Sequence, residues 1–261
     1  MYRISVCLIC HNTPERARLL RNSLAAWQRQ HTLAYEVIVA WDGDVAPGFH
    51  STARVTHVSV PKTQPLADRN AARNAAAHAA TGTHLWFVDG DFIPEPTVVA
   101  HAQIALEAED CALSPVLVST RATPQVWAQR PDTALYGVVG DQWSGFPHAY
   151  RPDKPGLTRA EDVVEGFPLL RRDVFWELGG FDATYVGWGA NKEEFVDRLR
   201  TLADFYPYKL LASTRMYHQP HLSEGDPTNP LVLENQLRRK TALDCAAMQN
   251  LPARVKVLCG F

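Results

Sequence analysis

Two aspartates on either side of one glycine, Asp89, Gly90 and Asp91, are the residues whose types and spacing most clearly allow chemistry. Carboxylates at this spacing can both reach one divalent cation, and Mg²⁺ or Mn²⁺ bound by few carboxylates keeps positions for phosphate oxygens of a substrate. The same residues are also common in turns, because Asp and Gly favour turn conformations. The motif alone leaves a site for metal and diphosphate and an ordinary turn both open.

The residues before this motif predict where it lies in the fold. Leu85 to Val88 form a short apolar run, and the Thr-Gly-Thr of residues 81–83 interrupts regular structure before it, which is typical of a buried central strand. In an open α/β sheet, ligands bind just outside the carboxyl ends of the strands. We therefore expect Asp89 and Asp91 at the ligand-binding edge of a sheet.

Predicted strands and helices alternate along the chain. Apolar periodicity predicts strands at residues 4–10, 35–41, 54–60, 112–119 and 205–213, and helices at residues 14–30, 66–80, 97–109, 171–178, in the second half of 179–199, and from 230 onward. Strand, helix and strand in this order imply parallel pairing through right-handed crossovers. We predict an α/β fold with a doubly wound, mostly parallel sheet, in a single domain spanning residues 1–261.

Two arginines on the helix predicted at residues 66–80 could bind an anion. Arg69 and Arg73 are one helical turn apart, so both guanidinium groups emerge on the same face. Each could bind a diphosphate through paired hydrogen bonds. A solvated helix face is the simpler alternative.

Residues 120–165 have no clear periodicity and mix Pro, Gly and aromatic residues. A loop of this length is usually functional or disordered, and the aromatic content favours function. We expect an acceptor site here, with Asp141 and Trp143 exposed, although a small packed subdomain fits the same composition.

The overall composition narrows the class of partner. A net charge of -2 and a pI near 6.5 give no general attraction to nucleic acid or an anionic membrane. No apolar stretch approaches the roughly 20 residues that a membrane helix needs. Five scattered cysteines, an odd number, argue against a disulfide framework. We expect a soluble, cytoplasmic protein with a small or neutral substrate.

Taken in order, these segments resemble the GT-A glycosyltransferases. The resemblance covers residues 3 to 221 and is closest to family 2 and to the galactosyl- and N-acetylgalactosaminyltransferases that share a carboxyl-terminal Gly-Trp-Gly motif. The matching segments are ISVCLICHNTPERARLL, Ala40 to Asp44, Ala72 to Asn74, Asp89 to Asp91, Gly179 to Arg198, and His218 after a late strand. The resemblance implies a Rossmann-like GT-A fold in which residues 1–119 bind the nucleotide sugar, 120–225 carry the acceptor and catalytic half, and 226–261 form a last helix and tail.

The resemblance also implies an activity: transfer of a hexose from a nucleotide sugar, most readily a UDP-sugar, to an unidentified glycan, small molecule or peptide, with Mn²⁺ or Mg²⁺. Asp42 would bind the base, Arg73 the ribose or diphosphate, and Asp89 the ribose or metal. The other implied donor-side residues are Asn12, Arg69, Gly90, Trp188 and Gly189. The implied metal ligands are Asp89, Asp91 and His218, with His221 as the alternative to His218.

Two departures from the family pattern affect the mechanism. Trp41 stands at the first acidic position of an Asp-Asp pair, so base recognition would rest on Asp42 and on stacking against Trp41. In the stretch that follows the Gly-Trp-Gly motif, Asn191 and Lys192 fill two positions that are acidic in the family. A lysine beside a diphosphate is a poor general base unless its pKa is strongly lowered.

Three explanations of the second departure stay open. Glu193, with Glu194 beside it, could deprotonate the acceptor. Alternatively, the enzyme could retain configuration, with the leaving phosphate accepting the proton. The chain could also bind a nucleotide sugar without efficient turnover. The catalytic candidates are therefore Asn191, Lys192, Glu193 and Glu194.

Two rival functions remain to be tested. A nucleotidyltransferase also combines a metal-binding carboxylate site with an α/β sheet, but it would normally show a Gly-rich, basic loop after the first strand, and HNTPER has no glycine. A sugar-nucleotide-binding protein without catalysis is the other rival. Donor hydrolysis separates it from an enzyme, because a binding protein should protect the donor and a transferase should slowly release sugar to water.

Overall fold

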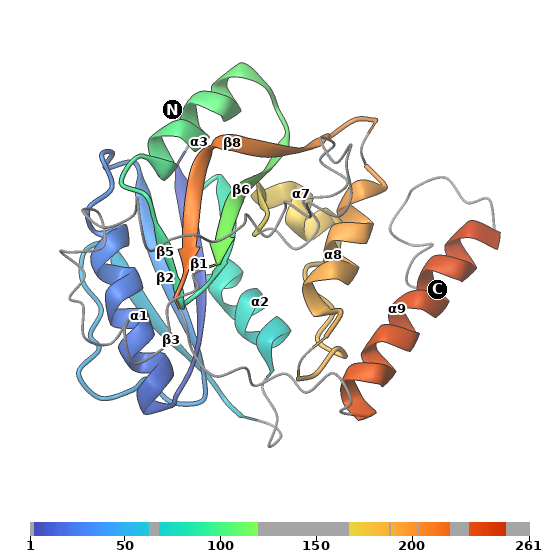
Figure 1. The fold of residues 1–261 in the computed structure, drawn as a ribbon, viewed down its shortest axis with the longest axis horizontal. Coiled ribbons are helices and arrows are strands. Elements are labelled where there is room, and N and C mark those ends of the chain that lie inside the picture. The colour runs from blue at the N-terminus through green and yellow to red at the C-terminus, as the bar shows by residue number, and fades with distance from the viewer. Residues whose placement is uncertain are drawn as a thin grey trace.

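One mixed sheet organises the described part of the chain, with helices on both faces (Figure 1). The computed structural model describes residues 3–62, 68–119, 167–187, 189–202, 204–219 and 230–248. Within these ranges the strands follow the order β3-β2-β1-β4-β7-β6-β8-β5. The strands are β1 (Ile4–His11), β2 (Tyr35–Asp42), β3 (Val55–Val60), β4 (His84–Asp89), β5 (Phe92–Pro94), β6 (Ala112–Ser119), β7 (Leu169–Arg171) and β8 (Tyr208–His218).

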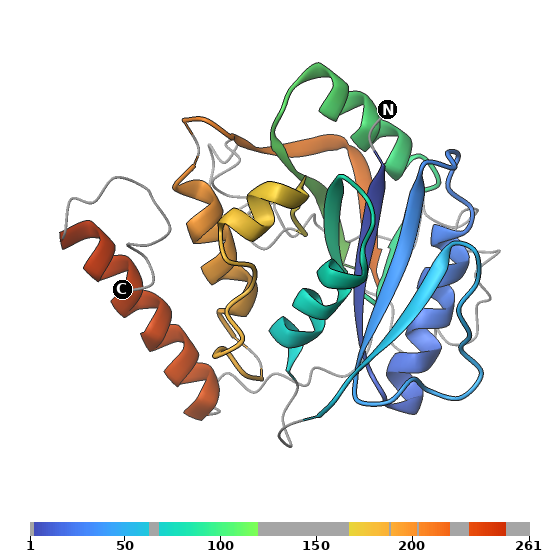
Figure 2. The same ribbon diagram turned by 180° about the vertical axis from the view of Figure 1, so that it is seen from behind.

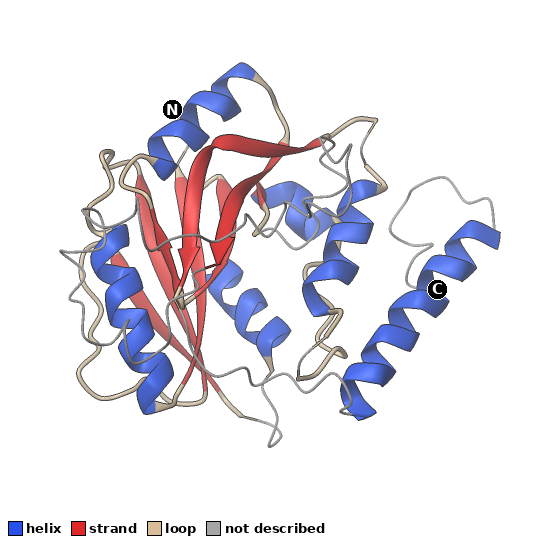
Figure 3. Ribbon diagram, in the orientation of Figure 1, coloured by secondary structure: helices blue, strands red, loops and turns tan. Residues whose placement is uncertain are grey.

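The helices lie in two layers around this sheet (Figure 2). Helix α1 (Pro14–Trp27) covers one face, and α2 (Arg69–Ala79), α7 (Arg172–Glu177) and α8 (Asn191–Arg200) lie on the other. Helix α3 (Val98–Ala108) lies at the end of the sheet where β1 begins, and α9 (Pro230–Met248) lies beyond α8. The alternation of strands and helices confirms the α/β class predicted from the sequence (Figure 3).

Parallel pairing brings three strand ends to one edge of the sheet. β1 pairs in parallel with β2 and with β4, so that His11 lies opposite Asp42 and Ile9 lies opposite Asp89. β2 and β3, and β6 and β8, are also parallel, whereas β7 is antiparallel to its neighbours and β5 to β8. The sheet is therefore mostly parallel, as expected, and the carboxyl ends of β1, β2 and β4 meet.

The core has two apolar layers because successive strand residues point to opposite faces. On the α1 face, Val6 and Leu8 pack in one cluster with Trp27 and Trp86. On the α2 face, Cys7 and Phe87 belong to a second cluster that includes the alanines of α2 and the phenylalanines of α7 and α8. Because β4 is buried on both faces, its sequence contains a continuous run of apolar residues.

Several predicted boundaries shift in the structure. The first helix ends at Trp27 rather than near residue 30, and the last predicted strand runs from Tyr208 to His218 rather than over residues 205–213. Strands β5 and β7 were not predicted because each has three residues, too few to show a periodicity. Among the described helices, none combines the length and apolar character needed to span a bilayer.

Candidate functional site

Asp89, the last residue of β4, lies between two cations. Its Oδ1 is 3.1 Å from Nη2 of Arg73 on α2, and its Oδ2 is 3.4 Å from Nζ of Lys192 on α8. Burial alone would raise the pKa of Asp89, but the positive charges of Lys192 and Arg73 outweigh it and hold the pKa well below its ordinary value. Asp89 is therefore a carboxylate at neutral pH.

Asp91 makes its contacts on the opposite side of the sheet edge. Its Oδ2 lies 2.6 Å from Nη1 of Arg16, in the first turn of α1, and 3.6 Å from Nε2 of His218, the last residue of β8. The backbone amide of Gln219 also donates to the carbonyl of Asp91 at 3.0 Å. The two carboxylates of the Asp-Gly-Asp motif thus have separate sets of partners.

Gly90 is needed where it is because the chain passes close to β1. Its amide donates to the carbonyl oxygen of Ile9 at 3.0 Å, and a Cβ added at Gly90 would lie 2.8 Å from that same oxygen. A side chain cannot be accommodated there without moving backbone. The motif is therefore a tight turn as well as a candidate site, and the turn separates Asp89 from Asp91.

The donor set for a divalent ion is smaller than the sequence predicted. Within the described residues, no three His, Cys, Asp or Glu side chains converge as a metal site. Asp91 and His218 do lie together, whereas Asp89 is held by Arg73 and Lys192. One carboxylate and one imidazole fit Mn²⁺ or Mg²⁺ when phosphate oxygens and waters complete the coordination shell.

Arg73 is fixed from several directions. Its Nη1 donates to Oδ1 of Asn70 at 2.8 Å, and its guanidinium lies 5.3 Å from the centre of the Phe181 ring. Asn70 in turn donates to the backbone carbonyls of Asp182 and Asn191. Arg73 is almost fully buried, so its guanidinium is directed at Asp89 rather than held with Arg69 on an exposed face.

Arg69 opens α2 one turn before Arg73 and is half-buried. Its positive charge helps to lower the pKa of Asp89, after the larger effects of burial, Lys192, Arg73 and Asp91. Arg69 therefore contributes to the electrostatics of the site, and its binding of a diphosphate stays a prediction.

Asp42 ends β2 beside His11. Oδ2 of Asp42 is 2.9 Å from Nδ1 of His11, while its Oδ1 is buried without a hydrogen-bond partner among the described residues. Burial would raise the pKa of Asp42, but the hydrogen bond and charge of His11 lower it below its ordinary value. A buried carboxylate oxygen with spare acceptor capacity suits a ligand N–H donor.

Trp41 does not offer a ring for stacking, contrary to expectation. It is fully buried in the α1-side cluster, where its Nε1 donates to Nδ1 of His57 at 3.0 Å and its ring lies 4.9 Å from that of Phe49. The reason is strand geometry, because neighbours on β2 point to opposite faces. The stacking prediction is wrong.

The start of α8 is shaped by a loop with left-handed backbone. Gly187, Gly189 and Ala190 have φ values of 76°, 96° and 58°. The Asn191 side chain donates to the carbonyl of Gly187 at 3.0 Å, and the Asn191 carbonyl accepts from Asn70. Asn191 therefore holds this loop against α2.

Lys192 follows directly and extends toward β4. Besides Asp89, its Nζ lies 4.4 Å from the centre of the Phe167 ring, just before β7. A cation over an aromatic face is favourable when both are partly desolvated. Lys192, one of the catalytic candidates from the sequence, thus reaches the candidate site.

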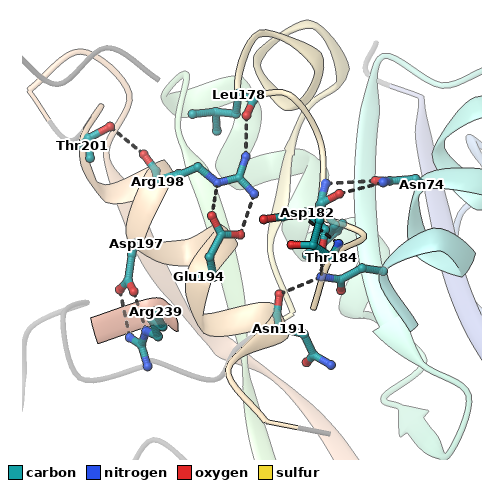
Figure 4. A network of polar contacts seen from close by, with 12 residues as sticks. Asn74, Leu178, Asp182, Thr184, Asn191, Glu194, Asp197, Arg198, Thr201 and Arg239 are labelled. Atoms are coloured by element: carbon teal, nitrogen blue, oxygen red, sulfur yellow. Dashed lines mark hydrogen bonds and ion pairs between the residues drawn. The ribbon is translucent and has the colours of Figure 1, made fainter. Parts of the chain in front are cut away.

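The two glutamates of α8 differ in their surroundings. Glu194 forms a paired contact with Arg198, whose Nη1 also donates to the carbonyl of Leu178 (Figure 4). Burial raises the pKa of Glu194 despite this pairing. Glu193 makes no hydrogen bond or ion pair with the described residues, although its charge reaches Arg73 and Arg239. Glu193 is thus the glutamate with a carboxylate available to a ligand.

Of the remaining predicted site residues, the structure describes Asn12 and Gly189. Asn12 is exposed just beyond β1, at the same edge as Asp42. A Cβ added at Gly189 would lie 3.0 Å from Val232, so this glycine lets α9 approach the loop. Asp141, Trp143, Trp188 and His221 lie outside the described residues.

Sequence reasoning missed several contributors to the site, among them Arg16, Asn70 and Phe167. A basic residue one turn into the helix after β1 could have drawn attention to Arg16, because that helix starts at the same sheet edge. Asn70 is three residues before Arg73, on the same helix face, so its hydrogen bond to Arg73 is a local contact that helical spacing allows. Its bond to the Asp182 carbonyl and the contact of Phe167 with Lys192 join residues about 110 and 25 positions apart, and no local pattern indicates them.

Comparison with known proteins now identifies the family. The sequence model described as glycosyl transferase family 2 matches residues 5–179, more than half of the chain. The chain belongs to glycosyl transferase family 2. The matched residues end before Gly187, so the Gly-Trp-Gly motif stays a prediction for this family member. No curated protein matches the chain significantly.

Two solved structures share the fold of this family 2 chain. TarS from S. aureus superimposes with a TM-score of 0.63 at 13% identity, over 94% of this chain and 40% of that one. GalNAc-T7, solved with UDP, GalNAc and Mn²⁺, gives a TM-score of 0.63 at 13% identity, over 93% of this chain and 49% of that one. The chain therefore spans less than half the length of either protein.

Proposed function

We propose that this family 2 protein transfers a hexose from a UDP-sugar to an acceptor hydroxyl. The observation that carries the proposal is the meeting of Asp42, Asp89 and Asp91 at one sheet edge, with Arg73, Lys192 and His218 around them. Such an edge, carrying both carboxylates and cations, suits a ligand with a base, a ribose and a diphosphate. The presence of UDP in the GalNAc-T7 structure supports this choice of donor.

Asp42 would recognise the base. Its Oδ1 is buried without a partner among the described residues, and the imide N–H of uracil is a donor that would satisfy it. His11 holds the other oxygen and so orients the carboxylate. Asn12 would border the base at the end of β1.

Asp91 and His218 would hold Mn²⁺ or Mg²⁺. Bound there, the ion would act as a Lewis acid toward the diphosphate of the leaving nucleotide. Arg16, which contacts Asp91 in this structure, would orient that carboxylate. Asp89 stays paired with Arg73 and Lys192, and we assign it to the ribose hydroxyls rather than to the metal.

Glu193 would take the proton of the acceptor hydroxyl. Glu194 is tied to Arg198 and Asn191 holds a loop, so neither side chain is available for proton transfer. Transfer with inversion would follow, with the bond from the anomeric carbon to the β-phosphate oxygen breaking as the acceptor oxygen attacks. Both electrons of that bond leave with the diphosphate.

Binding without turnover is the second candidate, because Lys192 is paired with Asp89 and stands where the resemblance implies an acidic residue. An assay of UDP release from a panel of UDP-hexoses, with and without Mn²⁺, separates the two functions. We expect slow hydrolysis by the native chain and a loss of at least about 100-fold in Glu193→Gln, since a general base contributes about 10²- to 10⁴-fold. Glu177→Gln, on α7, is the matched control. No UDP release from any donor, with binding intact, would leave only the second candidate.

A further inference from the structure

Lys192 is the second positively charged side chain, after Arg73, that pairs with the Asp89 carboxylate. Arg73 contacts Asp89 at 3.1 Å and is fixed by Asn70 and Phe181, whereas Lys192 is 3.4 Å from Asp89 on a flexible stem. Charge-assisted hydrogen bonds are usually about 2.7 to 2.9 Å long, so the lysine contact is the looser of the two. Asp89 would keep a partner if the ammonium moved away.

The position of Lys192 also limits what it can do. An ammonium group paired with a carboxylate has no lone pair with which to accept a proton, so Lys192 does not act as the base. Its side chain is 19% exposed and therefore partly open to solvent, and its ammonium lies beside Asp89 at the edge of the sheet. The group that a free cation there would attract is an anion.

We propose that Lys192 binds the diphosphate of the donor. On donor binding, Asp89 turns to the ribose and stays paired with Arg73, while Lys192 donates hydrogen bonds to oxygens of the β-phosphate. When the sugar bond breaks, its electron pair goes to the β-phosphate oxygen, and the lysine charge stabilises it without proton transfer. This inference rests on the proposed function and deepens it.

This arrangement predicts a specific ligand preference. Lys192 would distinguish a nucleoside diphosphate from a monophosphate, because only the diphosphate has the β-phosphate. A lysine that merely supports Asp89 would affect both ligands equally, because both carry the ribose. The preference would also persist when divalent ions are chelated.

The test measures UDP and UMP binding by titration calorimetry in EDTA and again in Mn²⁺. In EDTA, Lys192→Met should weaken UDP about 10- to 100-fold, the range expected for a hydrogen bond to a charged group, while UMP binding stays nearly unchanged. Lys192→Arg should keep most of the UDP affinity. Lys209→Met, at an exposed lysine paired with Glu109, is the matched control and should bind as the native chain does.

The failures of the two proposals are distinguishable. If the native chain binds UDP and Lys192→Met binds it equally well, the inference is wrong and the proposed function stands. Equal weakening of UDP and UMP also overturns it, since Lys192 would then act only through Asp89. If the native chain does not bind UDP in either buffer, the proposed function fails and the inference fails with it. Melting temperatures without ligand confirm that each variant is folded.

Discussion

The two sides of the Asp-Gly-Asp turn differ in what holds each carboxylate. On the α1 side, Asp91 meets Arg16 and the imidazole of His218, a possible metal ligand. On the α2 side, Asp89 meets Arg73 and Lys192, neither of which binds metal when protonated. A two-residue spacing that suggests one shared ion thus places the two carboxylates among different partners, and the two roles that we propose for them follow from those partners.

The structural cause of this difference is the tight passage at Gly90. The turn follows the Ile9 carbonyl closely, and the two flanking carboxylates contact residues of different helices. Each side chain then meets whichever helices cover its side, α1 for Asp91 and α2 with α8 for Asp89.

Loss of Arg73 should have the largest effect on stability. Arg73→Met removes the buried partner of Asp89 and leaves Lys192 as its remaining ion-pair partner in the described residues. Breaking a buried pair in this way costs about 3 to 5 kcal/mol, and we expect a loss near the lower figure. Urea denaturation measures it. Arg171→Met, in an exposed pair with Asp110, is the control and should cost under about 1 kcal/mol. Equal losses in the two variants would contradict the burial argument.

Loss of the Asp91 carboxylate should separate metal dependence from nucleotide binding. Asp91→Asn keeps the shape of the side chain but removes its charge, so Mn²⁺ stimulation of UDP release should fall about 100-fold or more. Asp89→Asn should weaken UDP binding while Mn²⁺ still stimulates the residual rate. If Mn²⁺ stimulation is lost in both variants to the same extent, the two carboxylates share the ion after all.

A side chain at Gly90 should disturb both sides together. Gly90→Ala places a methyl group 2.8 Å from the Ile9 carbonyl oxygen, and the backbone must shift to relieve the contact. Overpacking of this kind costs about 1 to 3 kcal/mol. We expect lower stability in urea and weaker UDP binding. Gly48→Ala is the control for adding a methyl group at a surface turn, although its φ of 82° adds strain of its own.

The pH dependence of folding stability should show that Asp89 is charged in the folded protein. Its folded-state pKa lies below the unfolded value of about 3.9, so the stabilisation is fully present above that pH and is lost as pH falls through the folded pKa. The stability difference between the native chain and Asp89→Asn should be constant from about pH 5 to 7 and shrink below about pH 4. A difference that grows toward acid would mean that the folded pKa is raised instead.

The sequence predicted which strand ends form the site better than it predicted the side-chain contacts within the site. The run before Asp89 and the turn after Asp42 are local patterns, so the sheet edge could be predicted from them. The strand that ends at His218 was predicted to end at residue 213, five residues too early. The burial of Trp41 follows from strand alternation, and the stacking hypothesis overlooked it. Lys192 and Asp89 contact each other although they are 103 positions apart in the sequence. No local periodicity contains such a contact, because only the folded chain brings the start of α8 to the end of β4.

The most direct test of the account is thermal stabilisation by UDP, GDP and CMP, each with and without Mn²⁺. A ligand at about 100 times its dissociation constant stabilises the folded state by roughly 2.7 kcal/mol, which is readily measured as a shift in melting temperature. We predict a shift with UDP that Mn²⁺ enlarges, and we predict that Asp91→Ala abolishes the Mn²⁺ effect but leaves part of the UDP shift. No shift with any nucleotide, in either condition, would contradict the proposal that this sheet edge binds a nucleotide sugar.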